Sequence, residues 1–119
     1  MIPALLVSGG DYLARETAVA GKLAATAAQT SVEVILEGLP SGQHVLTPSP
    51  TLNIQRIAPG CMCCIGNLAM RVTLNRVLRR KPGLLVISLA SSEHLQNIRE
   101  FLTQEPYNGL LQLTEEIQL

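Results

Sequence analysis

The sequence has few aromatic residues and no excess of charge of either sign. Only 3% of its 119 residues are aromatic, with one Phe, two Tyr and no Trp. Aliphatic side chains must therefore supply most of any core, which suits helices packed against a buried sheet. Nine Lys and Arg balance nine Asp and Glu, so the charge gives no reason to expect nucleic acid or an anionic membrane as a partner.

Long apolar runs and a leader-like pattern are also missing. No apolar stretch approaches the roughly 20 residues of a membrane span, and no basic segment at the start leads into an apolar one. We therefore expect a cytoplasmic protein with no membrane and no nucleic-acid partner. The apolar fraction of 47% indicates a folded chain, and the length fits a single domain over residues 1–119.

Apolar runs and helical periodicity alternate along the chain. Strands are predicted at 3–8, 31–36, 53–57, 84–89 and 110–119, and helices at 12–28, 66–80 and from Ser91 or Ser92 to 105. Residues 38–50 contain two glycines and three prolines and are predicted to be a loop. This alternation predicts an α/β fold with a mostly parallel sheet of about four or five strands and helices on both faces.

The cysteines lie close together in the sequence. Cys61, Cys63 and Cys64 fall within four positions and follow Pro59-Gly60. A secreted disulfide framework would instead distribute its cysteines along the chain. Thiolates are soft ligands that prefer zinc and similar ions, and a turn opened by Pro59-Gly60 could direct all three to one ion. The N-terminus of the next helix would lower the pKa of these thiols.

Three thiolates leave a tetrahedral zinc site one ligand short. The candidates for the fourth ligand are His44, His94, a second subunit, a client protein and water. We favour His94 because it follows a strand that ends at the same edge of the sheet as the cysteine turn. Two alternatives use the same cysteines: a thiol redox module, and a structural or regulatory interaction module in which the cysteines are idle.

The helix after the cysteines predicts a partner surface. It carries two apolar stripes, whereas a helix lying on a sheet buries only one. The first stripe contains Ile65, Leu68 and Val72, and the second contains Met70, Leu74, Val77 and Leu78. A short sheet also leaves strand edges that need cover. We therefore expect a homodimer, which would bring two sets of cysteines together.

These features together resemble a known family. The first strand reads Ile-Pro-Ala-Leu-Leu-Val-Ser-Gly, and a Gly-Cys-x-Cys-Cys motif, a helix and an apolar strand follow. Over residues 2–102 this pattern resembles the N-terminal half of the CobW-like family, P-loop GTPases that act as metallochaperones or metal-insertion factors. The resemblance implies a truncated three-layer sandwich of the P-loop NTPase type. It also implies Cys61, Cys63 and Cys64 as metal ligands, zinc or a similar soft metal as the cofactor, and a full-length relative or a metalloprotein as a partner.

The part of the sequence that would bind nucleotide departs from the family pattern. Aligned without gaps from the first strand, Arg15 stands where a P-loop has Lys, and Glu16 stands where it has the magnesium-binding Ser or Thr. Gly9, Gly10 and Thr17 are what is left of a degenerate nucleotide loop. The acidic residue after the later strand and the base-recognition motif are missing. We therefore expect no nucleotide and no GTPase activity, but a metal carrier, sensor or accessory subunit.

Overall fold

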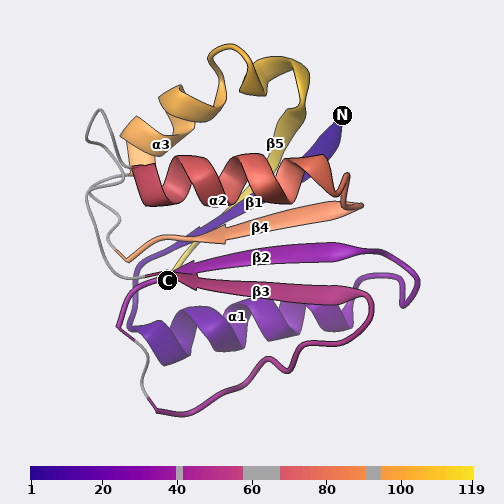
Figure 1. The fold of residues 1–119 in the computed structure, drawn as a ribbon. Helices are drawn as coiled ribbons and strands as arrows, with labels where there is room; N and C mark the ends of the chain where they lie inside the picture. Colours follow the sequence, from indigo (N-terminus) through magenta and orange to yellow (C-terminus); the bar gives the residue numbers. More distant parts are fainter. Residues whose placement is uncertain (40–41, 58–67, 91–94) are drawn as a thin grey trace.

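The computed structural model describes residues 1–39, 42–57, 68–90 and 95–119, with the backbone alone for residues 68–70. In this part of the chain, five strands alternate with three α-helices (Figure 1). In chain order the elements are β1 (Ile2–Ser8), α1 (Tyr12–Ala24), β2 (Val32–Glu37), β3 (Leu52–Ile57), α2 (Leu68–Arg79), β4 (Leu84–Ser88), α3 (Leu95–Leu102), the 3-10 helix η2 (Tyr107–Gly109) and β5 (Leu111–Gln118).

The five strands form one sheet in the order β3-β2-β4-β1-β5, and every neighbouring pair is parallel. The chain crosses the sheet in one direction from β1 through β2 to β3, and then returns through β4 to β5. Right-handed crossovers in opposite directions must lie on opposite faces. Figure 1 shows this arrangement, with α1 on one face and α2 and α3 on the other. The predicted α/β class, with a parallel sheet between helices, is confirmed.

Each face of the sheet has its own aliphatic core, because successive strand residues point to opposite sides. In β1, Ala4 and Leu6 belong to the core under α2 and α3, whereas Leu5 and Val7 belong to the core under α1. The first core also contains Leu74, Val77, Leu78, Leu85, Ile87, Leu95, Ile98 and Leu102. The second contains Val19, Val32, Val34, Leu36, Leu46 and Val86.

Helix α1 ends four residues earlier than the sequence predicted. The N–H groups of Ala25 and Thr26 donate to the carbonyls of Lys22 and Leu23, and the Thr26 hydroxyl also donates to the Lys22 carbonyl. These short-range bonds satisfy carbonyls that a continuing helix would use. The alanine-rich segment after Ala24 therefore forms a turn into β2, although its composition favours helix.

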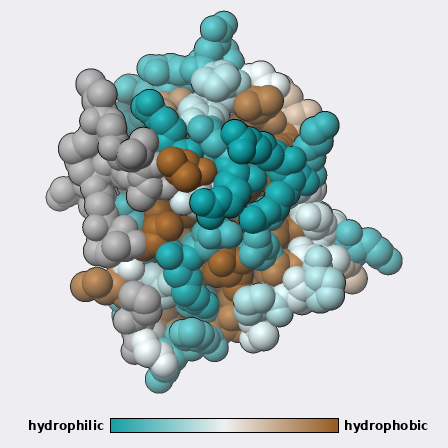
Figure 2. Space-filling model, in the orientation of Figure 1, coloured by the Kyte–Doolittle hydropathy of each residue, from teal (hydrophilic) through white to brown (hydrophobic). Residues whose placement is uncertain are grey.

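The described part of α2 buries one apolar stripe and exposes a residue of the other. Leu74, Val77 and Leu78 are buried, whereas Val72 is 46% exposed. Ile65 and the side chains of Leu68 and Met70 lie outside the described residues. The exposed large apolar residues of the described chain come from separate elements, and Figure 2 shows hydrophobic residues interspersed with hydrophilic ones on the visible face.

Helices that could span a membrane do not occur among the described residues, because none combines sufficient length with sufficient apolar character.

Candidate functional site at the carboxyl edge of the sheet

The parallel sheet brings all its strand ends to one edge, called here the carboxyl edge. Ligands of open α/β sheets bind outside this edge. Strand β3 ends at Ile57 and β4 at Ser88, and β2 pairs with both. Since neighbouring strands are about 4.8 Å apart, these two ends lie about 10 Å apart.

Two chain segments connect this edge with helices on the same face. Residues 58–67 follow β3 and precede α2, and residues 91–94 lie between Ala90 and α3. Helices α2 and α3 both pack into the core that contains Leu6. The four flanking residues Ile57, Leu68, Ala90 and Leu95 therefore define one region, called here the shared corner.

Of the five predicted ligands, His44 alone is among the described residues. Cys61, Cys63, Cys64 and His94 lie in these two segments and outside the described residues. Among the residues that are described, no group of three or more His, Cys, Asp or Glu side chains could hold a metal ion. His44 is described and exposed. It lies in the loop before β3, whose Leu46 packs into the core under α1, on the face opposite to α2.

Arg15 is buried at the carboxyl edge, where it joins the ends of β2 and β4 to the turn after β1. Its Nε donates to the Ser88 hydroxyl at the end of β4 over 2.9 Å. One terminal nitrogen donates to the Gly10 carbonyl after β1 over 3.1 Å, and the other donates to the Glu37 carbonyl at the end of β2 over 3.0 Å. Only 3% of Arg15 is exposed. The guanidinium thus points into the protein and not toward an external anion.

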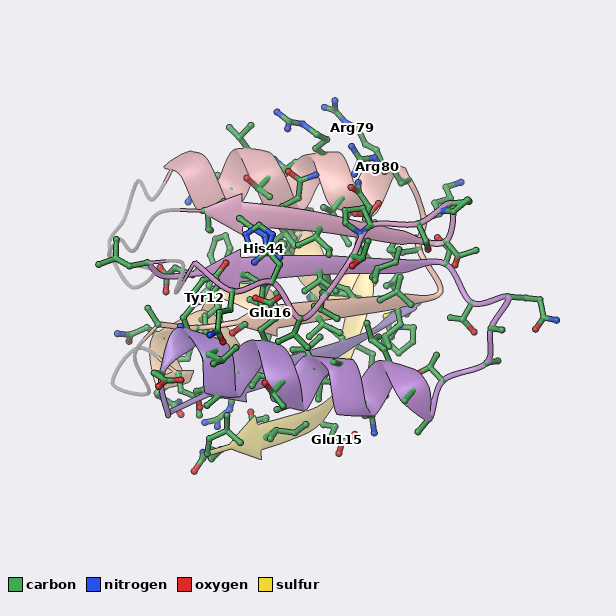
Figure 3. The ribbon with its side chains drawn as sticks, turned by 90° about the horizontal axis from the view of Figure 1, so that it is seen from below. Tyr12, Glu16, His44, Arg79, Arg80 and Glu115 are labelled. Atoms are coloured by element: carbon green, nitrogen blue, oxygen red, sulfur yellow. The ribbon has the colours of Figure 1, made fainter. Side chains whose placement is uncertain are left out.

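Glu16, the next residue along α1 (Figure 3), binds β3. Both of its carboxylate oxygens accept hydrogen bonds from Arg56 of β3, at 3.0 and 3.1 Å. One oxygen also accepts the N–H groups of Val45 and Leu46, at 2.8 and 2.7 Å. Arg56 donates a further bond to the Tyr12 hydroxyl. Glu16 therefore connects α1 with β3 and with the loop that contains His44.

Burial and neighbouring charged groups shift the pKa values of Glu16 and Arg15 in opposite directions. Burial raises the pKa of Glu16, but hydrogen bonds from Arg56 and from the Leu46 and Val45 N–H groups outweigh burial, so its pKa lies below the ordinary value. The hydrogen bond to Glu16 raises the pKa of Arg56. Burial lowers the pKa of Arg15, although Glu37 acts in the opposite direction. Glu16 is thus an anion at neutral pH, and both arginines are cations.

The turn between β1 and α1 is short and negatively charged. Three residues, Gly9, Gly10 and Asp11, separate the strand from the helix. Both glycines have positive φ, and a Cβ at Gly9 would lie 2.5 Å from the Leu119 carbonyl oxygen. The Asp11 carboxylate caps α1 by accepting the Ala14 N–H over 2.7 Å. A carboxylate therefore occupies the helix N-terminus at which a P-loop would bind phosphate.

Thr17, the last residue of the predicted degenerate loop, does not face this turn. It lies one helical turn further along α1 and is exposed. Its hydroxyl donates to the Leu13 carbonyl within the same helix over 2.8 Å.

Two buried polar side chains lie on the α2 and α3 face of the edge. Glu37 is 1% exposed, and its Oε1 accepts the Ala90 N–H over 2.9 Å. Strand alternation places Ser8 on this face as well. The Ser8 hydroxyl is the buried side-chain group without a hydrogen-bond partner among the described residues. Carboxylate and hydroxyl oxygens therefore border the shared corner.

The fully buried face of α1 is not formed mainly by its aliphatic residues. Leu13, Ala20 and Leu23 are only partly buried, and Ala24 is exposed. The fully buried residues are Tyr12, Arg15, Glu16 and Val19. Charged residues are seldom buried unless they are paired, and their partners come from strands distant in sequence. The sequence signal for this buried face was the helical spacing of these four residues, which places them on one side of α1.

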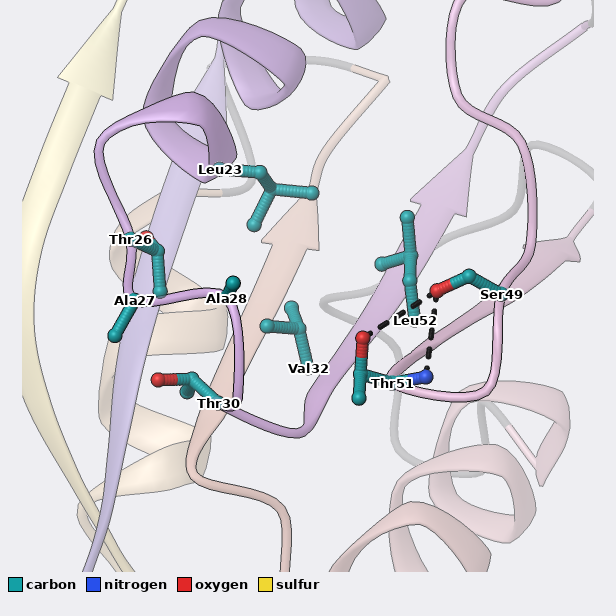
Figure 4. Close-up of a pocket in the computed structure, with 9 residues that line it drawn as sticks. All are labelled: Leu23, Thr26, Ala27, Ala28, Thr30, Val32, Ser49, Thr51 and Leu52. Atoms are coloured by element: carbon teal, nitrogen blue, oxygen red, sulfur yellow. Dashed lines mark hydrogen bonds between the residues drawn. The ribbon is translucent and has the colours of Figure 1, made fainter.

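A separate hollow lies at the opposite, amino edge of the sheet (Figure 4). Its volume is about 200 Å³, and it lies between the end of α1 and the starts of β2 and β3. Leu23, Val32 and Leu52 form an apolar wall, while Ser49 and Thr51 bind each other at its rim. Its lining residues are all uncharged. The hollow therefore has neither the charge nor the ligands of the carboxyl edge.

Comparison with known proteins gives one match. Over 61 residues the chain is 38% identical to the "Zinc chaperone YeiR" of Escherichia coli (strain K12). The matched residues make up 50% of this chain but 19% of that chaperone, so the chain spans a small part of the relative it matches. No family model matches the chain, and no solved structure matches it. The chain is thus partly similar to a protein named for handling zinc.

Proposed function

We propose that this chain binds zinc, or a similar soft transition metal, through Cys61, Cys63 and Cys64, and acts as a carrier, sensor or accessory subunit. The observation that carries the proposal is the position of Ile57, the residue from which the chain continues into the cysteine segment. Ile57 ends β3 at the carboxyl edge of a parallel α/β sheet, where such folds bind ligands. The partial similarity to a zinc chaperone, together with the resemblance to CobW-like proteins, supports metal handling as its role.

The shared corner holds a buried carboxylate, which also interacts with the Arg15 guanidinium. The Glu37 carboxylate is buried there, and a buried negative charge stabilises a nearby metal ion more strongly than an exposed one would. Through its bond to the Ala90 N–H, Glu37 also fixes the start of segment 91–94. Thiolates would add further negative charge, which a bound divalent ion would neutralise. We therefore assign the metal site to this corner, with the thiols reduced as in the cytoplasm.

The described neighbours of the two candidate fourth ligands lie on different faces of the sheet. His94 immediately precedes Leu95, which is buried in the core under α2 and α3. His44 precedes Val45, whose N–H binds Glu16 on the α1 face. The sheet therefore lies between His44 and the core that α2 and α3 cover. We propose His94, and not His44, as the fourth ligand.

The matched variants His94→Ala and His44→Ala test this assignment. We expect His94→Ala to weaken zinc binding by at least about tenfold, because loss of a tetrahedral ligand leaves water in its place. We expect His44→Ala to change the affinity less than about twofold. Competition with a chromophoric zinc chelator measures both. Equal effects of the two substitutions would contradict the assignment of His94.

We further propose that metal binding here operates without nucleotide. Arg15 is committed to Ser88 and to two carbonyls, and the Asp11 carboxylate caps the helix N-terminus. A phosphate-binding loop needs free backbone N–H groups and a Lys that reaches the phosphates. Both requirements conflict with the contacts of this turn.

The expected result is that GTP with magnesium at millimolar concentration leaves the thermal midpoint of the protein unchanged. A ligand at about 100 times its Kd would stabilise the folded state by about 2.7 kcal/mol, which scanning fluorimetry detects readily. Zinc serves as the positive control in the same assay. A saturable upward shift with GTP would refute this part of the proposal.

A further inference from the structure

The first two turns of α1 contact the turn after β1 and the ends of β2, β3 and β4. Arg15 binds Gly10 in the turn after β1, and Glu37 and Ser88 at the ends of β2 and β4. Glu16 binds β3 through Arg56. Arg15 and Glu16 are adjacent in sequence, and both are almost completely buried. Two side chains of one helix thus connect the ends of β2, β3 and β4, in addition to the hydrogen bonds of the sheet.

We propose that Arg15 and Glu16, called here the α1 clamp, position the shared corner by holding these strand ends in one arrangement. The inference rests on the proposed metal function and adds positioning residues to it. Arg56 immediately precedes Ile57, from which the cysteine segment starts. Ser88 lies two residues before Ala90, from which segment 91–94 starts. The clamp therefore holds residues that shortly precede both segments that carry the proposed ligands.

The same positions explain how the edge keeps its arrangement without a nucleotide. In a working P-loop, the Lys and the following Ser or Thr contact phosphate and magnesium. When the chain is aligned with that motif without gaps, Arg15 and Glu16 stand at these two positions, and both bind the protein itself. A cation and an anion of the chain replace contacts that a ligand would otherwise make. The clamp consists of side chains of the protein itself and therefore requires no bound ligand.

Gly38 and Tyr12 pack closely against the clamp. A Cβ at Gly38, just after β2, would lie 2.8 Å from Arg15 Nη2 and 2.8 Å from Tyr12 Cδ2. Both arginines also lie near the Tyr12 ring, with guanidinium carbons 5.9 and 6.0 Å from its centroid. Cation–π contact of this kind adds to the hydrogen bonds. Arg15, Tyr12 and Arg56 are thus held as one packed group.

Hydrogen exchange at the two edges of the sheet can test the clamp directly. The Gly38 and Leu89 N–H groups bond across the carboxyl edge, to the Ile57 and Val7 carbonyls. The Val32 and Leu84 N–H groups bond across the amino edge, to the Thr51 and Ser31 carbonyls. Local opening of one edge speeds exchange of its own amides only. A variant that disrupts the clamp should therefore speed exchange more at the carboxyl edge than at the amino edge. General destabilisation should speed exchange at both edges alike.

Arg56→Met and Arg80→Met form a matched pair for this test. Arg80 binds Glu33 from the end of α2, and Glu33 is buried like Glu16. We expect Arg56→Met to speed exchange of the Gly38 and Leu89 amides by at least about tenfold, as for lost hydrogen bonds to a charged group. We expect Arg80→Met to leave those two amides within about twofold of the wild type. If Arg56→Met speeds amide exchange equally at both edges, the proposal of a clamp is wrong.

Tyr12→Phe and Ser88→Ala provide milder changes in case Arg56→Met fails to fold. Each removes one hydroxyl that binds Arg56 or Arg15. We expect both variants to speed amide exchange more at the carboxyl edge than at the amino edge, by a smaller factor than Arg56→Met. Equal acceleration of exchange at the two edges would contradict the proposed clamp.

A second readout links the clamp to the metal site. Cobalt(II) bound by thiolates absorbs in the visible, and its bands report ligand geometry. We expect Arg56→Met to shift these bands and to weaken cobalt binding by about 10- to 100-fold, as for other residues that orient metal ligands. An unchanged spectrum and affinity would overturn the positioning role. Absence of cobalt and zinc binding in the wild type, with the exchange pattern intact, would refute the metal function and leave the clamp as a structural feature.

Discussion

Replacing Cys61, Cys63 and Cys64 together by serine is expected to lower bound zinc from about one ion per chain to about none. Serine has nearly the same size as cysteine but lacks the soft, easily ionised sulfur that zinc prefers. The chain has no other cysteine, so no second thiol can substitute. Elemental analysis of protein purified without chelator measures the zinc content.

Single substitutions refine this result. We expect each of Cys61→Ser, Cys63→Ser and Cys64→Ser to weaken binding without removing it, because two thiolates and His94 would still coordinate the ion. His44→Ala is the control that leaves all thiols in place. Wild-type protein that contains no metal and takes up neither zinc, copper(I) nor cobalt would refute the proposed function. Reversible disulfide formation in such metal-free protein would favour the redox alternative.

The Glu16→Gln variant is expected to lose about 3 kcal/mol of the free energy of unfolding at neutral pH. Glu16 is fully buried, and its carboxylate accepts from Arg56 and from two backbone N–H groups. Glutamine loses the negative charge and one acceptor, which leaves a mostly buried guanidinium without its counterion. Breaking a buried pair in this way typically costs about 3–5 kcal/mol. Urea unfolding followed by circular dichroism measures the loss.

The matched control is Glu115→Gln. Glu115 pairs with Lys22 on the surface, and both side chains are more than a third exposed. An exposed pair of this kind contributes about 0–1 kcal/mol. A Glu16→Gln variant as stable as Glu115→Gln would contradict the role assigned to the buried network.

The stability difference between wild type and Glu16→Gln should depend on pH with a definite sign. The pKa of Glu16 is lowered in the folded state from its ordinary value of 4.5. A carboxylate with a lowered pKa stabilises the fold above its unfolded pKa, and this contribution is lost as the pH falls through the folded value. We therefore expect the full difference from about pH 5 upward and a decreasing difference below about pH 4.5. A difference that grows on acidification would contradict this assignment.

The amino-acid sequence alone predicted the alternation of strands and helices, the parallel sheet and the helices on both faces. Continuous apolar runs such as Leu84 to Ile87 indicate strands buried on both sides, and short-range signals such as the Asp11 cap mark helix starts. The cysteine motif was equally visible, because its three thiols are neighbours in sequence. Its assignment to metal is still a prediction.

Tertiary structure decided the environment of Arg15 and Glu16. From the sequence they were only residues unsuited to a phosphate loop, since their partners Ser88 and Arg56 are 73 and 40 positions away. Hydrogen bonds between distant residues depend on strand order, which local periodicity does not encode. The strand order also places His44 and Glu37 on opposite faces of the sheet. Which charged side chains the protein buries, and which face of the sheet each one serves, was therefore set by the fold.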